Sequence, residues 1–282
     1  MKLKDKVAII TGSGAGIGKA IAERFAREGA AVVCCSRRES NGRPVAEKIT
    51  DQGGRALFVA CDVSKEEDVK RAVEAGIEAY GCIDILVNNA GVNFSRPFEC
   101  TASEDWDRVI DTDLRGTFLF CRYCIPNMLL RKKGSILNIA SNHTAGGYPG
   151  SAPYDAAKWG VIGFTKALAT EFASRGIRIN ALSPGLIDTQ IWEDLKNASP
   201  SRQECEQYWY SNIPSGRVGR PEEVAAAAAF MVSDEASYLV GSNVILDGGA
   251  SSLLVSKPPF ESENLDGGIR QHSEIKGIEG TV

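Results

Sequence analysis

The sequence of 282 residues contains no apolar stretch long enough to cross a membrane. The longest apolar run, residues 224–232, is rich in alanine and has about half of the length that a membrane span needs. The first ten residues carry three lysines and a short apolar run, without the long apolar segment and cleavage site of a signal peptide. We therefore expect a cytoplasmic protein without a membrane partner.

An excess of positive charge is also lacking. The chain has 32 Lys and Arg against 36 Asp and Glu, with a formal net charge of −4 and no long basic run. Such a chain has no surface designed to neutralise a phosphate backbone, so we predict no nucleic-acid partner.

Eight cysteines are present, but their arrangement predicts neither a redox motif nor a metal site. Cys34 and Cys35 lie in an apolar, strand-like run. Cys121 and Cys124 form a C-x-x-C pattern deep inside a helical pattern, whereas a reactive pair is expected at a helix N-terminus. We interpret the cysteines as structural thiols, and we predict no metal.

Apolar and turn-forming residues alternate along the chain in a pattern of about seven strand–helix repeats. Repeats of this kind predict an α/β fold with a mainly parallel sheet and helices on both faces. Predicted strands cover residues 7–11, 31–35, 56–60, 83–87, 135–140, 178–182 and 244–246. Predicted helices cover 17–28, 45–52, 64–80, 103–130 with a bend or break near Pro126, 151–174, and a segment that begins at Pro221.

A glycine-rich turn, TGSGAGIG, joins the first predicted strand to the first helix at residues 11–18. Gly12, Gly16 and Gly18 allow a tight turn and a close approach of the backbone to a pyrophosphate. The helix N-terminus that follows offers free N–H groups to the same anion. The spacing differs from G-x-G-x-x-G, and a merely flexible turn is the alternative, but the position between strand and helix favours a nucleotide.

Tyr154 and Lys158 are four residues apart on a predicted helix and so share one face. Ser141 follows a predicted strand, at the sheet edge where ligands bind in open α/β sheets. A lysine ammonium would lower the tyrosine pKa from about 10, so that Tyr154 could exchange a proton with an alcohol while Ser141 donates to the same oxygen. A Tyr–Lys pair at this spacing is otherwise common on helix surfaces.

Together these motifs resemble the classical short-chain dehydrogenase/reductase family from about Lys6 to Gly249. The matching motifs are T-G-x-x-x-G-x-G at 11–18, Asp62-Val63, N-N-A-G at 88–91, Ser141 with Tyr154-x-x-x-Lys158, and S-P-G at 183–185 with Thr189. The resemblance implies a single Rossmann-type domain over residues 1–255, with a substrate loop at 186–218. Residues 256–282 are interpreted as a polar C-terminal extension.

The resemblance also implies roles for individual residues. Ser141, Tyr154, Lys158 and Asp113 would form the catalytic set. Asp113 replaces the family's Asn, and we hypothesise that it pairs partly with Lys158 and weakens the effect of that lysine on Tyr154. The cofactor would be bound by Gly12, Ser13, Gly16, Ile17, Gly18, Ser36, Arg37, Arg38, Asp62, Val63, Asn89, Ala90, Gly91, Tyr154, Lys158, Pro184, Gly185, Ile187 and Thr189.

Cofactor choice depends on the end of the second strand. NAD enzymes of this type place an acidic residue there for the ribose hydroxyls, whereas this chain has Ser36 followed by Arg37 and Arg38. Arginine suits a 2′-phosphate, so we predict NADP in preference to NAD. The alternative is that the two arginines form a solvated turn.

The substrate is predicted from a few polar and aromatic side chains: Asn93, Asn142, His143, Tyr148 and Trp192. Their polarity favours hydroxyl-rich substrates. The segment 184–194 is similar to the branch that contains L-fucose dehydrogenase, also called 17-beta-hydroxysteroid dehydrogenase type 14, and sugar or polyol dehydrogenases. A small-ketone, hydroxysteroid or 3-oxoacyl reductase is the alternative, and a non-catalytic dinucleotide sensor is an alternative of another class. The family resemblance further implies a homotetramer or homodimer.

Overall fold

Seven parallel strands form one sheet in the computed structural model, which describes residues 1–254. The strand order is β3-β2-β1-β4-β5-β6-β7, and each neighbouring pair is parallel. The strands are β1 (Val7–Thr11), β2 (Ala31–Ser36), β3 (Arg55–Ala60), β4 (Ile85–Asn88), β5 (Gly134–Ile139), β6 (Ile177–Pro184) and β7 (Asn243–Leu246).

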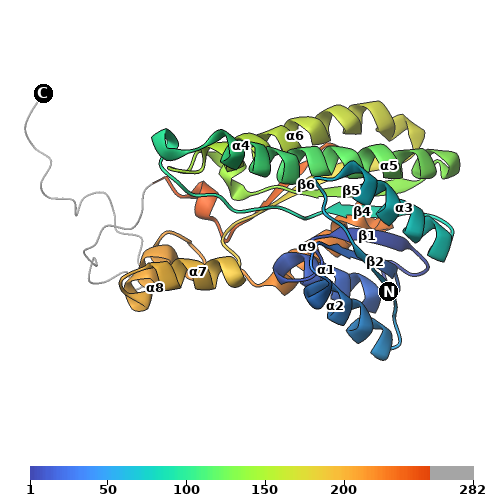
Figure 1. Ribbon diagram of the computed structural model, residues 1–282, viewed down its shortest axis with the longest axis horizontal. Coiled ribbons are helices and arrows are strands. Elements are labelled where there is room, and N and C mark those ends of the chain that lie inside the picture. The colour runs from blue at the N-terminus through green and yellow to red at the C-terminus, as the bar shows by residue number, and fades with distance from the viewer. Residues whose placement is uncertain (255–282) are drawn as a thin grey trace, which may run out of the picture.

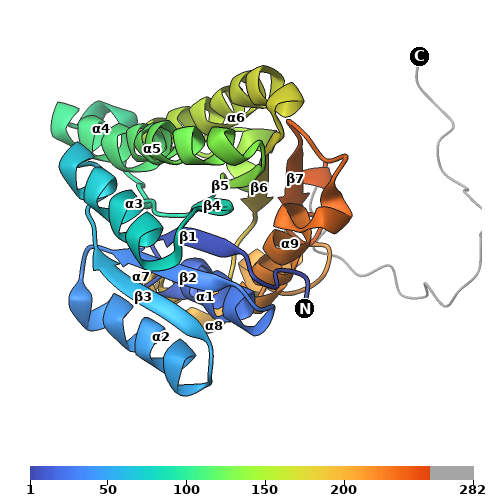
Figure 2. The same cartoon turned by 90° about the vertical axis from the view of Figure 1, so that its right-hand side faces the viewer.

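Helices cover both faces of this sheet (Figures 1 and 2). On one face lie α1 (Gly16–Arg27), α2 (Glu39–Asp51) and α9 (Pro221–Val232); on the other lie α3 (Glu66–Tyr80), α4 (Ser103–Val109), α5 (Gly116–Arg131) and α6 (Ala152–Phe172). Each helical layer has its own apolar core against the sheet, because the central strands are buried on both faces. The arrangement confirms the predicted single Rossmann-type domain.

The order of the strands positions the functional site. The chain runs outward from β1 through β2 to β3, and then returns to the other side of β1 to form β4. At such a switch point the connections after neighbouring strands lead to opposite faces and leave a crevice at the carboxyl ends. The glycine turn follows β1 and the N-N-A-G motif follows β4, so both motifs meet at this crevice.

Two predicted helices differ from the structure. The helix expected over 103–130 consists of α4, a π-helical segment η2 (Ile110–Arg115) and α5. Pro126, expected near a bend or break, lies inside α5, so the change in helical geometry occurs before it. The helix expected at 45–52 begins at Glu39.

Residues 186–218, predicted as a substrate loop, fold instead into two helices, α7 (Gln190–Ala198) and α8 (Arg202–Ser211). Backbone hydrogen bonds from Asp188 to Gly219 (2.8 Å) and from Gly219 to Leu186 (2.9 Å) close the base of this segment. Trp192 is 2% exposed and packs with Ile213 and Val218 in a small separate core. We call residues 186–218 the helical insert. The predicted extension 256–282 lies outside the described residues.

None of the helices described in residues 1–254 is long and apolar enough to cross a membrane.

Candidate active site

Ser141, Tyr154 and Lys158 border one cavity of about 510 Å³ at the carboxyl end of the sheet. Tyr154 and Lys158 lie one turn apart on α6, and the Lys158 ammonium is 5.4 Å from the centre of the Tyr154 ring. Ser141 comes just after β5, at the start of the short helix η3 (Asn142–Ala145). The structure therefore brings together the three residues that the sequence selected.

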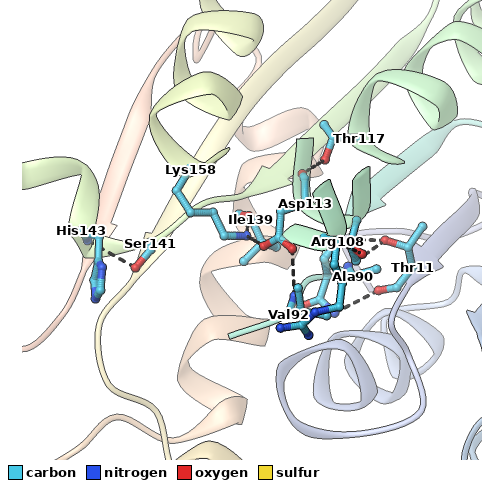
Figure 3. A network of polar contacts seen from close by, with 12 residues as sticks. Thr11, Ala90, Val92, Arg108, Asp113, Thr117, Ile139, Ser141, His143 and Lys158 are labelled. Carbon is cyan, nitrogen blue, oxygen red and sulfur yellow. Dashed lines mark hydrogen bonds and ion pairs between the residues drawn. The ribbon is translucent and has the colours of Figure 1, made fainter. Parts of the chain in front are cut away.

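Asp113, carried by η2, completes this group. Its Oδ2 lies 3.0 Å from the Lys158 ammonium, which also donates a hydrogen bond to the Ile139 carbonyl at 3.2 Å. Figure 3 shows the two side chains pointing toward one another. The Lys158 side chain is 6% exposed and that of Asp113 is fully buried, so the ion pair is shielded from solvent.

Burial alone would lower the Lys158 pKa, because a buried ammonium loses its hydration. The negative charges of Asp113 and of an ionised Tyr154, with the hydrogen bond to Asp113, outweigh this effect and raise the Lys158 pKa. The lysine therefore remains an ammonium at neutral pH and is a permanent positive charge beside Tyr154.

Asp113 is also fixed by the backbone of the N-N-A-G region. Its Oδ1 accepts a hydrogen bond from the Val92 N–H at 2.8 Å, as Figure 3 shows. A side chain at Gly91 would place its Cβ 2.7 Å from Asp113 Oδ2, so only glycine fits beside the carboxylate. The π-helical geometry of η2, which is common at functional sites, carries Asp113 at this position.

Ser141 is oriented by the residues that follow it. Its Oγ accepts a hydrogen bond from the His143 N–H at 3.2 Å, and its carbonyl accepts one from the Thr144 hydroxyl at 2.7 Å. No residue in the described part of the chain accepts the hydrogen of the Ser141 hydroxyl, which leaves it available to a ligand oxygen in the cavity.

A second cavity of about 330 Å³ adjoins the first along the glycine turn. Gly12 has a left-handed backbone (φ +66°), and a Cβ there would lie 2.8 Å from Asn89 Nδ2. The Thr11 hydroxyl accepts hydrogen bonds from the N–H groups of Asn89 and Ala90, both at 2.9 Å. Within residues 1–254 no side chain caps the N-terminus of α1, so its first N–H groups can bind an anion. The cavity therefore fits the phosphates of a dinucleotide.

The two cavities share Gly91, Ile17, Thr189 and Ile191, so one elongated ligand can extend through both. Most of the predicted cofactor residues line them. Gly12, Gly16, Gly18, Ser36, Arg37, Arg38, Val63, Asn89 and Ala90 border the second cavity, and Tyr154, Lys158, Pro184, Gly185 and Ile187 border the first.

Ser13, Asp62 and Trp192 are exceptions, because they line neither cavity. Ser13 is buried and donates to the Cys35 carbonyl (3.2 Å). The Asp62 carboxylate accepts hydrogen bonds from the backbone and the hydroxyl of Ser64. Trp192, expected to contact substrate, faces the small core of the helical insert. The other predicted substrate residues, Asn93, Asn142, His143 and Tyr148, do line the first cavity.

Sequence reasoning missed several residues of the site. Asn41 borders the second cavity, and Ile191, Leu195 and Trp209 of the helical insert border the first. The aromatic composition of residues 186–218 indicated a functional segment, but the helical geometry decides that Trp209, and not Trp192, reaches the cavity. Ala250, Ser251 and Leu253, after β7, also border it.

The C-x-x-C cysteines line neither cavity. Cys121 and Cys124 are buried on α5, and burial raises the pKa of Cys121 to about 12. All eight cysteines are free thiols. A thiol with so high a pKa is a poor nucleophile, which agrees with the structural role predicted for this pair.

Comparison with known proteins agrees with this site. A family model described as enoyl-(acyl carrier protein) reductase matches residues 12–251. The chain is 43% identical to 3beta-hydroxysteroid dehydrogenase 1 of Eggerthella lenta, over 88% of this chain and 94% of the relative. It is 41% identical to glucose 1-dehydrogenase 2 of Bacillus subtilis (88% and 95%) and 39% identical to a 3-oxoacyl-(acyl-carrier-protein) reductase of Thermotoga maritima (88% and 99%).

Among solved structures, one described as a candidate gluconate dehydrogenase from Agrobacterium tumefaciens superposes with a TM-score of 0.84 and 34% identity, over 90% of this chain and 98% of that one. The chain belongs to the classical short-chain dehydrogenase/reductase family. It is an oxidoreductase of alcohol and ketone substrates, and its family uses nicotinamide dinucleotides.

Proposed function

We propose that the protein oxidises a secondary hydroxyl of a sugar or polyol with NADP, or catalyses the reverse reduction. The observation that carries this proposal is the cavity in which Ser141, Tyr154 and Lys158 lie beside the polar side chains of Asn93, Asn142 and His143. When a hydroxyl-rich molecule enters such a cavity, hydrogen bonds to these side chains can replace the ones that it made with water. The similarity to a glucose dehydrogenase gives further support.

In the proposed mechanism, Ser141 donates a hydrogen bond to the substrate oxygen and Tyr154, as phenolate, removes the hydroxyl proton. The Lys158 ammonium stabilises the phenolate by its charge. Asp113 holds Lys158 in place and offsets part of that charge. A nicotinamide bound in this site would supply the acceptor for the hydride of the alcohol carbon, and in the reverse reduction it would supply the hydride while Tyr154 returns the proton.

The free N–H groups at the N-terminus of α1 would hold the pyrophosphate, and Pro184, Gly185, Ile187 and Thr189 would border the nicotinamide. The preference for NADP depends on the edge of the second cavity. Ser36 lines it with Arg37 and Arg38, both exposed and without a carboxylate partner among the described residues. The neighbouring Arg43, in contrast, is paired with Glu39. Unpaired guanidinium groups are suited to a 2′-phosphate.

A hydroxysteroid substrate is the second candidate. The lining of the first cavity also includes the apolar residues Leu186, Leu195 and Ile213. The hydroxysteroid dehydrogenase of Eggerthella lenta shares 43% of its aligned residues with this chain. A rigid apolar ring system would fit this part of the lining.

Self-association is the partner interaction that we propose. Phe118 and Trp159 are 42% and 51% exposed on α5 and α6, and Phe230, Tyr238 and Ile245 are exposed around α9 and β7. A homotetramer would cover both the surface of α5 and α6 and the surface around α9 and β7. A homodimer would cover one of them. Sedimentation of the full chain distinguishes these states, and a monomer at micromolar concentration would refute both.

The proposed function is tested by following reduced-nicotinamide absorbance with aldoses, polyols, hydroxysteroids and small ketones, each with NADP and with NAD. We expect turnover of a sugar or polyol with NADP. Arg37→Ala should raise the KM for NADP roughly 10- to 100-fold and change that for NAD little, because a charge-assisted contact is lost. Arg43→Ala is the matched control. Turnover with NAD alone would refute the cofactor assignment, and turnover of steroids alone would favour the second candidate.

A further inference from the structure

A second carboxylate-bound side chain, His143, lies beside the catalytic tyrosine. Its Nδ1 is 2.6 Å from Oδ1 of Asp155, the residue after Tyr154. Asp155 Oδ2 accepts a hydrogen bond from the Tyr148 N–H at 2.9 Å. One carboxylate thus fixes both the His143 ring and the backbone that carries Tyr148, and both of these residues border the first cavity.

Ring stacking extends this arrangement along the wall of the cavity. The His143 ring stacks on Tyr148, with centroids 5.1 Å apart and planes inclined by 22°, and it meets the edge of Tyr154 at 5.3 Å. Tyr148 stacks in turn on Trp209 of α8, at 6.1 Å and 13°. We call Tyr148, His143 and Trp209 the aromatic wall. It leads from the catalytic tyrosine to the helical insert.

The contact with Asp155 determines which hydrogen-bonding group His143 can present to a ligand. An ionised carboxylate only accepts hydrogen bonds, so the proton of a neutral imidazole lies on Nδ1. The lone pair is then on Nε2, which has no partner in residues 1–254. A ring that lines the cavity with a fixed acceptor selects a ligand hydroxyl that donates to it.

We propose that His143 accepts a hydrogen bond from a hydroxyl on the carbon next to the reacting carbon of a cyclic polyol or sugar. The centres of the His143 and Tyr154 rings are 5.3 Å apart. A ligand that bonds to both residues must therefore carry two hydroxyls near one another, as a vicinal diol does. Asp155 is a positioning residue that acts through His143. This inference rests on the proposed sugar or polyol oxidation and specifies the substrate class further.

The same geometry discriminates against a substrate with a single hydroxyl. Such a molecule leaves His143 Nε2 without a partner in a cavity from which it has displaced water. A site that pairs with a substrate hydroxyl has a much lower kcat/KM for an analogue without that hydroxyl, because a polar group of the site is then left buried without a hydrogen bond. A monohydroxylated steroid would therefore be a poorer substrate than a cyclic diol.

The test compares two probes, cis-cyclohexane-1,2-diol and cyclohexanol, with the full-length enzyme and NADP. We expect kcat/KM to favour the diol by roughly 10- to 100-fold. His143→Phe keeps an aromatic ring in the wall but removes the acceptor, and should bring the ratio of the two kcat/KM values close to one. Asp155→Asn should lower this ratio less than His143→Phe does. Its effect should be larger on the KM for the diol, which rises, than on kcat. Asp107→Asn, on the exposed side of α4, is the charge-matched control.

The possible outcomes separate this inference from the proposed function. A ratio that stays high in His143→Phe, or a wild-type enzyme that uses both probes equally or neither, overturns the role of His143. Turnover of sugars or polyols in the broader panel would still support the proposed function in that case. A ratio that falls in His143→Phe and not in Asp107→Asn supports the inference.

Discussion

The catalytic cavity has an inner floor and an outer wall that are stabilised in different ways. The floor holds Tyr154 with Lys158 and Asp113, and the side chains of the last two are 6% and 0% exposed. The wall holds His143, which is 23% exposed and is fixed by Asp155 of α6, and it continues through Tyr148 into a ring contact with Trp209 of the helical insert. The floor is thus fixed by the sheet, whereas the wall depends on a segment attached at its edge.

We expect the chemistry and the specificity to reside in different parts of the cavity. The floor contains the groups that we propose for proton transfer, and they lie at the carboxyl end of the sheet. The wall contains the groups that we expect to select the substrate, and they come from the helical insert and from the loop after β5. A change in the wall should alter the choice of substrate, whereas a change in the floor should alter the rate for every substrate.

The largest expected effect comes from the floor. Tyr154→Phe removes the hydroxyl that exchanges the proton, and kcat should fall by about 10³-fold for every substrate. Tyr238→Phe, at a fully exposed tyrosine, is the matched control. Steady-state kinetics and dinucleotide binding measure the two consequences. Substantial turnover by Tyr154→Phe would contradict the assigned role, and a cellular function that survives in it would favour a non-catalytic sensor.

A smaller effect is expected at Asp113. Asp113→Asn leaves the Lys158 charge less compensated, so the Tyr154 phenolate is stabilised and the acid limb of the pH–rate profile for oxidation should move down by about one unit. The pH dependence of kcat/KM measures this shift. Asp111→Asn, in the same π-helical segment, is the control. An unchanged profile in Asp113→Asn would refute the hypothesis that this carboxylate tunes the tyrosine.

The Lys158 ion pair also provides a stability readout. The folded-state pKa of Lys158 lies above its ordinary value of 10.5, so the pair stabilises the fold fully below that pH and less as the pH rises through the folded-state pKa. The Tm of Asp113→Asn should therefore fall less than the Tm of the wild type as the pH is raised into the alkaline range. This measurement needs no turnover, so it separates the ion pair from the catalytic effect.

The smallest expected effect concerns the attachment of the helical insert. Arg217, at the end of this segment, forms an ion pair with Glu223 of α9. The Glu223 carboxylate accepts hydrogen bonds from the Arg217 side chain and from the Arg220 N–H, and these lower the Glu223 pKa to about 2. The stabilisation is present above the ordinary pKa of 4.5 and is lost as the pH falls toward 2. Glu223→Gln should lower Tm by at most about 2 °C at neutral pH.

Glu222→Gln provides the comparison for this change, since Glu222 lies in the same first turn of α9. The Tm difference between wild type and Glu223→Gln should narrow between pH 4.5 and 2. A difference that stays constant over this range would show that the pair with Arg217 is not its source. A larger KM for substrate in Glu223→Gln would indicate that the wall of the cavity depends on this anchor.

Most of the fold could be predicted because buried parallel strands and amphipathic helices have strong local patterns. The π-helical segment η2 could not be predicted, because over six residues the apolar periodicity of a π-helix cannot be distinguished from that of an α-helix. The sequence predicts a loop for the helical insert, because the polar and aromatic composition of this segment hides the apolar cluster around Trp192. Within the site, Tyr154, Lys158 and Ser141 were accessible through their spacing and chemistry.

The order of strands and helices, the glycine turn, the candidate catalytic residues and the family could all be inferred from the sequence, because they depend on local periodicity and on motifs at fixed spacing. Three contacts became visible only in the folded protein: Asp113 meets Lys158 directly, Asp155 holds His143, and Trp209 rather than Trp192 reaches the cavity. These contacts join segments whose approach depends on how helices pack across the sheet. Side-chain direction at such a meeting point is set by packing, which no local pattern encodes.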